Sequence, residues 1–122
     1  PIYLQIIDEV KRAVARGALR PGDRLPSQRE LAQSLRVNPN TVQRAFREME
    51  VMGLVETVRG EGTFVRADPG RLKRLREELA ASAVRQFVQE VRALGLEEAE
   101  VLALVRAALK GEEVAPWASS RP

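Results

Sequence analysis

The strongest constraint on the fold is a connection of only two residues, Val37 and Asn38, between two short predicted helices. Ser27 and Glu30 begin the first helix as a capping box, in which the side chain of each satisfies a backbone N–H of the other. Asn38 is a favourable N-cap for the second helix, and Pro39 follows at the first helical position, where its missing N–H costs nothing. So tight a connection is typical of a helix-turn-helix, which presents its second helix outward. A generic helical hairpin is the alternative.

The second helix has one apolar face and one polar face. Its apolar side chains recur at i, i+3, i+4 and i+7, which predicts one buried stripe of Val42, Ala45, Phe46 and Met49. The opposite face carries side chains suited to base-edge and phosphate contacts in a DNA groove, namely Asn40, Gln43, Arg44 and Arg47. Any surface helix shows polar residues opposite an apolar stripe, so this pattern alone does not identify a DNA-binding helix. Together with the segments before and after it, residues 39–52 are interpreted as the recognition helix of a winged helix-turn-helix, which stops at Gly53.

The segments before this motif add a helix and a turn. Residues 1 to about 15 predict an amphipathic helix that Gly17 ends. Pro21-Gly22 is typical of a type II turn, and residues 23–25 predict a short extended strand because Pro26 follows them. The helix after Ser27 is expected to end near Arg36 and to bury Leu31, Ala32 and Leu35.

A β-hairpin is predicted directly after the recognition helix. Residues 54–58 and 63–65 are rich in strand-forming side chains, and the turn between them contains Gly60 and Gly62. In this position a hairpin is a wing, spanning residues 54–65. Arg59 and the backbone N–H groups near both glycines would then lie close to phosphates or the minor groove. The alternative is a structural hairpin whose glycines only make the turn.

Composition excludes several function classes. The chain has no Cys and no His, so the commonest metal ligands and the commonest general base are absent, and no paired-acid constellation stands out. We therefore expect no enzyme, cofactor or metal site. No apolar run reaches the roughly 18–20 residues of a membrane span, which favours a cytoplasmic location.

Residues 1–66 hold 11 Lys and Arg against 8 Asp and Glu, whereas residues 67–122 hold 9 of each, so the basic excess of +3 lies in the predicted DNA-binding half.

Residues 17–65 resemble the winged-helix domain of GntR-type bacterial transcriptional regulators. Four blocks in the right order and spacing carry the resemblance: GALRPGDRLPSQRELA at 17–32, VNPNTV at 37–42, MGLV at 52–55 and GEGTFV at 60–65. Residues 1–6 are similar to the start of many family members. Residues 38–42 and the short C-terminal part resemble the YtrA-like subgroup in particular.

The resemblance implies a dimeric repressor that binds a pseudo-palindromic operator in double-stranded DNA, with half-sites often of the GT…AC kind. The expected DNA-binding residues are Ser27, Gln28, Arg29, Asn38, Pro39, Asn40, Thr41, Gln43, Arg44, Arg47, Arg59, Gly60 and Gly62. Many relatives carry Arg where this chain has Pro39 and Gln43. Because Arg prefers guanine and Gln prefers adenine, a base assignment does not transfer from those relatives.

The remaining residues predict two helices, one from Arg71 to about Leu94 and one that begins with Glu97-Glu98 and is closed by Gly111. We expect this pair to be too small to enclose a sizeable ligand pocket. Its apolar stripes favour pairing with a second copy, and the expected dimerisation residues are Leu72, Leu75, Leu79, Phe87, Val91, Leu104 and Leu109. The alternative is that these helices pack on their own winged helix.

The sequence therefore predicts a mainly α fold with a small β-hairpin, in which a winged helix-turn-helix is followed by a short two-helix C-terminal module. The expected parts are a DNA-binding domain at 1–67, a helical dimerisation module at 68–112 and a loose tail at 113–122. The expected function is sequence-specific regulation of transcription as a homodimer. A winged-helix module that docks proteins and leaves DNA alone is the alternative. Control by a small-molecule effector and control by expression level alone are both compatible with the sequence.

Overall fold

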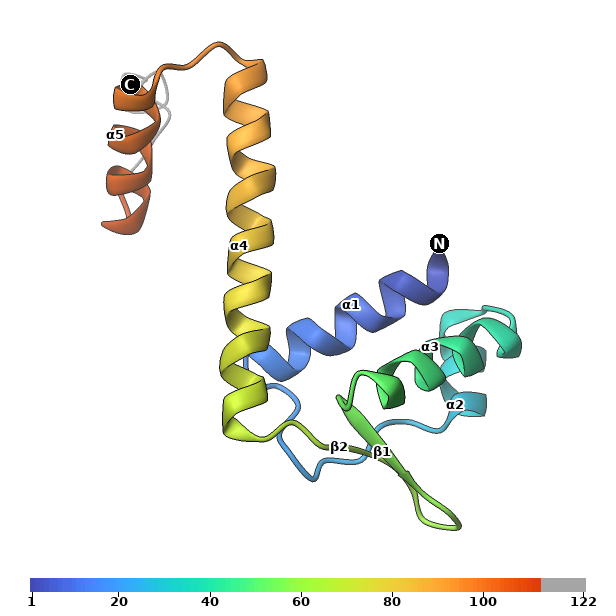
Figure 1. The fold of residues 1–122 in the computed structure, drawn as a ribbon. Helices are drawn as coiled ribbons and strands as arrows, with labels where there is room; N and C mark the ends of the chain where they lie inside the picture. Colours follow the sequence, from blue (N-terminus) through green and yellow to red (C-terminus); the bar gives the residue numbers. More distant parts are fainter. Residues whose placement is uncertain (113–122) are drawn as a thin grey trace, which may run out of the picture. The chain divides into compact units, whose positions relative to one another are not determined.

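The computed structural model describes residues 1–112, which form five helices and one antiparallel pair of strands (Figure 1). In chain order the elements are α1 (Ile2–Ala15), α2 (Gln28–Leu35), α3 (Pro39–Val51), β1 (Val55–Val58), β2 (Gly62–Val65), α4 (Pro69–Ala93) and α5 (Glu98–Leu109). The predicted fold class is confirmed. The predicted tail at 113–122 lies outside the described residues.

By its contacts the chain divides into two compact units, residues 1–80 and the residues from 81 onward. The sequence predicts a boundary between the two parts after residue 67. In the structure the first turns of α4 belong with the winged helix instead, because Leu75 is buried in its core and Leu72 and Leu79 pack against that core.

Helix α3 is the centre of the first unit. All four side chains of its predicted stripe are buried, with Val42, Ala45 and Met49 entirely so. Helix α1 lies against α3 and contributes Ile6, Ile7 and Val14 to the same core (Figure 1). The prediction of the buried stripe is confirmed, and the polar face of α3 is consequently turned outward.

The predicted helix starts are also confirmed. The Ser27 hydroxyl oxygen accepts from the backbone N–H of Glu30 at 3.0 Å, and the Asn38 side-chain oxygen accepts from the N–H of Asn40 at 2.8 Å. The capping box at Ser27 is only half formed, because no bond from the Glu30 carboxylate back to Ser27 is found within residues 1–112. Arg36 ends α2 in the left-handed region at φ 55°.

The expected burial of Leu35 is wrong, since 48% of this side chain is exposed. Ala32 is buried and Leu31 packs against the core, but Leu35 lies one turn further on, at the last position of α2. There it lines an open groove beside Ile2 of α1.

The two strands pair in an antiparallel register that joins Val55 to Val65 and Val58 to Gly62. The short strand expected at 23–25 is reduced to a single bridge between Arg24 and Phe64. Gly62 has φ 130°, a backbone conformation that favours glycine.

Helix α4 begins at Pro69 rather than at Arg71, because Asp68 caps its first turn. The backbone N–H of Arg71 donates to the Asp68 carboxylate at 2.8 Å. This hydrogen bond lowers the pKa of Asp68, and the charges of Arg71 and Arg74 lower it further. Further along, the Arg76 Nε donates to the Ala15 carbonyl oxygen at the end of α1 at 2.7 Å.

The second unit contains the later turns of α4 and the whole of α5. Val91 is buried within it, and Leu104 is half-buried. Phe87 is 36% exposed and Leu109 is 83% exposed, although both belong to the predicted stripes. None of the helices in residues 1–112 is both long and apolar enough to cross a membrane.

Replacing Phe46 by Ala should destabilise the fold by about 3–5 kcal/mol, because it removes a buried ring and leaves a cavity. Val51→Ala is the matched control on the same helix, since Val51 is 80% exposed, and its effect should stay within about 0.5 kcal/mol. Urea unfolding followed by circular dichroism measures both. Equal losses for the two variants would contradict a core centred on α3.

Candidate nucleic-acid interface

The first turns of α2 and α3 form a shared groove of about 450 Å³ on the surface of the first unit. Five residues predicted to bind DNA line it together: Gln28, Arg29, Pro39, Asn40 and Gln43. Their side chains are all exposed. The groove therefore brings amide groups, which can donate to and accept from base edges, next to a guanidinium that can bind phosphate or guanine.

Ser27 and Asn38 have a structural role at this surface. The side-chain oxygen of each accepts from a backbone N–H in the first turn of its helix, as described above. Thr41, which was also predicted to bind DNA, is half-buried within the first turn of α3. The remaining N–H groups and the positive dipole end of α3 give this surface an intrinsic preference for anionic groups.

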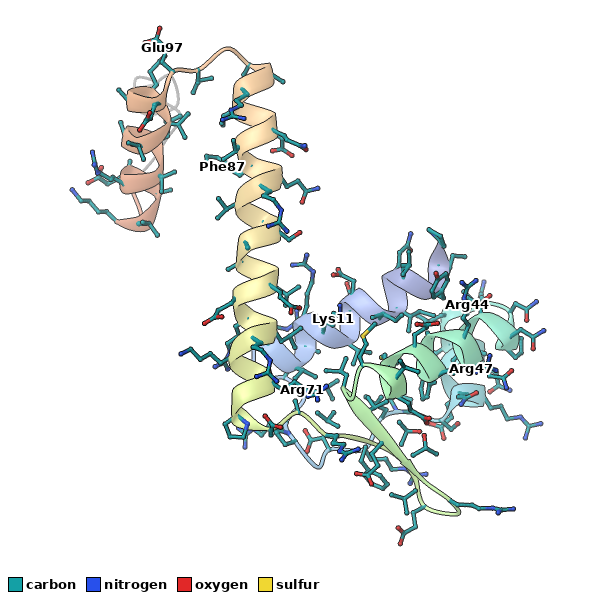
Figure 2. The ribbon with its side chains drawn as sticks, in the orientation of Figure 1. Lys11, Arg44, Arg47, Arg71, Phe87 and Glu97 are labelled. Carbon is teal, nitrogen blue, oxygen red and sulfur yellow. The ribbon has the colours of Figure 1, made fainter. Side chains whose placement is uncertain are left out.

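Arg44 and Arg47 project from α3 and are both exposed (Figure 2). Arg44 is held by α1, because its guanidinium stacks 3.9 Å from the centre of the Tyr3 ring and donates to the Tyr3 hydroxyl at 3.2 Å. Tyr3 lies in the first turn of α1 and is half-buried. Its contact with Arg44 spans 41 residues of sequence, and helical periodicity carries no signal for such a pair.

A side-chain hydrogen bond joins the wing to the recognition helix. The Thr57 hydroxyl in β1 hydrogen-bonds to the Glu50 carboxylate in α3, and it also lies 3.1 Å from the Thr63 hydroxyl of β2. Arg59 and Gly60 lie at the exposed turn of the hairpin. Arg59 therefore lies at the turn of a hairpin whose Val55 and Val65 pack in the same core as α3.

Within residues 1–112, no group of three or more acidic side chains is placed to hold a metal ion. The groove between α2 and α3 likewise contains no Asp or Glu among its lining residues. The polar groups that line it are the side-chain amides of Gln28, Gln33, Asn40 and Gln43 and the guanidinium of Arg29.

The chain matches known regulatory proteins over this same region. Residues 2–65 match the family described as bacterial regulatory proteins, gntR family. The HTH-type transcriptional regulator YhcF of Bacillus subtilis is 42% identical over 111 residues, covering 91% of this chain and 92% of YhcF. The HTH-type transcriptional repressor YtrA of Bacillus subtilis is 42% identical over 85 residues, covering 65% of each chain.

Solved structures agree with this match. A GntR family transcriptional regulator from Listeria monocytogenes superposes with a TM-score of 0.77 and 37% identity, over 87% of this chain and 93% of that one. The AraR DNA-binding domain in complex with operator ORX1 superposes with a TM-score of 0.51 and 32% identity, over 53% of this chain and 78% of that one.

These relatives are transcriptional regulators and not enzymes. The resemblance to the GntR family, and to YtrA within it, is confirmed. This chain belongs to the GntR family of bacterial regulatory proteins and is a DNA-binding transcriptional regulator.

Proposed function

We propose that the chain is a homodimeric repressor, in which the α3 helices of two copies read the two halves of a pseudo-palindromic operator. The groove shared by α2 and α3 carries this proposal, because it gathers five of the predicted DNA-binding residues on one exposed surface. YtrA is a repressor, and the AraR domain was solved on operator DNA, which supports the same role here. This function would place the protein in the cytoplasm, where bacterial DNA lies.

The side chains of the interface divide into two roles. Arg29 and Arg47 anchor phosphates or guanine, whereas Asn40 and Gln43 read base edges. Arg44 joins the first group, and its stacking on Tyr3 limits its reach to the side of α3 that faces α1. The wing presents Arg59 to phosphates or the minor groove.

The proposed dimer rests on uncovered apolar side chains in the second unit. Exposed large apolar residues gather there, namely Val84, Phe87, Leu94, Leu102 and Leu109. A second copy of the same pair of helices would cover them, as symmetric helix bundles do. Leu72, Leu75 and Leu79 already pack within the first unit, so the proposed contact uses the residues beyond them.

A protein-docking module without DNA binding has less support. The outward face of α3 is polar, with Arg44 and Arg47 in its middle turns and Glu50 in its last turn, and Val51 in that last turn is an exposed large apolar side chain on α3. The similar proteins reported above are transcriptional regulators.

Selection of DNA from a random pool should enrich an inverted repeat, and the mass of the free protein in solution should be that of a dimer. An enriched inverted repeat identifies the operator. If no sequence is enriched, and affinity only falls as salt is raised, binding is driven by charge alone and the proposed function is wrong.

Replacing Gln43 and Arg47 separates base reading from phosphate binding. Arg47→Ala should weaken all sites alike and reduce the salt slope by about one unit. Gln43→Ala should instead relax the preference at one base position, at a loss of about 1–3 kcal/mol on the selected operator. Fluorescence anisotropy on the operator and its single-base variants, at several salt concentrations, measures both effects. A uniform loss for both variants would show that this division of roles is incorrect.

The Phe87→Asp variant tests the dimer. A carboxylate at this position should dissociate the dimer at micromolar concentration, because the proposed interface would bury it without a partner. Gln86→Asp adds the same charge at the neighbouring exposed position and should leave the dimer intact. Sedimentation velocity measures the mass, and circular dichroism checks that both variants keep their helices. A dimeric Phe87→Asp variant would place the interface elsewhere.

A further inference from the structure

A cavity of about 390 Å³ lies in the first unit, on the side of α3 at which the helix ends. Its lining comes from α1, from the connection between α3 and β1, and from the first turns of α4. The residues are Lys11, Met52, Leu54, Arg71, Arg74, Leu75 and Glu78. None of them belongs to the proposed DNA interface.

The cavity combines an apolar floor with a positive rim. Leu54 and Leu75 are buried, and Met52 adds a flexible apolar side chain. Lys11 of α1 and Arg71 of α4 converge on the cavity from two helices (Figure 2). Arg74 joins them one turn along α4.

The positive charges of this rim exceed the negative ones. The lining holds three cations, Lys11, Arg71 and Arg74, and one carboxylate, Glu78, which leaves an excess of two positive charges. Asp68 lies beside Arg71 and Arg74 but is not part of the lining. In residues 1–112 the one ion pair within 4.0 Å joins Arg12 to Asp8, so no carboxylate neutralises the three cations at contact distance.

We propose that this cavity binds a small organic dianion, in which two carboxylates or one phosphate monoester are attached to a compact apolar body. Two negative charges on the ligand would balance the excess of two cations in the lining. Its apolar body would pack against the floor formed by Met52, Leu54 and Leu75. The size fits the lower end of the range of about 300–1,000 Å³ that is usual for ligand pockets. Arg71 and Arg74 supply the planar donor groups that bind carboxylate or phosphate through two parallel bonds.

The cavity is coupled to the recognition helix through Arg71. Its guanidinium donates to the carbonyl oxygen of Met52, the residue that caps the C-terminal end of α3. The same guanidinium lies over Gly53, where a Cβ would come 2.8 Å from the Arg71 Cζ. A bound anion competes with the Met52 carbonyl for these donors. The ligand therefore loosens the hold of α4 on the end of α3, and this consequence rests on the proposed function because it acts through DNA affinity.

Binding can be tested without DNA by isothermal titration calorimetry. The probes are phenyl phosphate and phthalate, which carry the two kinds of dianion on the same ring, and inorganic phosphate, which lacks an apolar body. Saturable binding of one phenyl phosphate or phthalate per chain is expected, with inorganic phosphate weaker by about tenfold or more. Whichever of the two aromatic probes binds tighter identifies the anionic group.

Variants locate the site. Lys11→Gln and Arg74→Gln should each weaken binding of the tighter probe by about tenfold or more, because each removes a charged donor. Arg85→Gln removes the same charge at an exposed position of the second unit and should bind like the parent chain. Thermal unfolding checks that all three variants fold. Absence of saturable binding by both aromatic probes, or equal binding by all three variants, would overturn the site.

The coupling to α3 has a separate readout. The tighter probe should lower the affinity of the parent chain for its selected operator, and the Arg74→Gln variant should lose that response while it still binds the operator. An unchanged operator affinity with a saturated cavity would overturn the coupling. A chain that binds the probe but selects no operator would instead contradict the proposed function and leave the anion site established.

Discussion

The structure depends on the complete burial of one stripe of α3. Four apolar side chains of this helix face α1 and the neighbouring core, and Phe46 and Met49 are the largest of them. Burying them fixes the rotation of the helix about its own axis, because turning it would expose them and bury Arg44 and Arg47. The outward position of Arg44 and Arg47 is therefore set by the burial of the opposite face of α3.

Local signals predicted most of this arrangement. Asn38 and Pro39 mark the start of α3, and the spacing of apolar residues marks its inner face, because both depend on neighbours within one or two helical turns. The contacts that orient the functional side chains were not predictable in this way. Tyr3 holds Arg44 across 41 residues, and such a pair leaves no periodicity in the sequence.

Helical periodicity also does not predict which part of α4 packs against the winged helix. Apolar residues repeat at helical spacing along its whole length, so the pattern does not distinguish a residue that packs within the chain from one that remains uncovered. Leu75 is buried against the winged helix, whereas Val84, Phe87 and Leu94 of the next unit are exposed. Asp68 caps the first turn of α4, and Leu72, Leu75 and Leu79 of its first turns belong to the core of the winged helix or pack against it.

Two arginines of α4 bind the C-terminal ends of two other helices. Arg71 donates to the carbonyl of Met52 at the end of α3, and Arg76 donates to the carbonyl of Ala15 at the end of α1. Each cation meets the negative end of a helix dipole and a carbonyl that has no partner inside its own helix. An anion in the cavity next to Arg71 acts on the first of these bonds and leaves the second in place. Since Arg76 still holds α4 to α1, a ligand can change the support of the recognition helix without releasing α4 from the core.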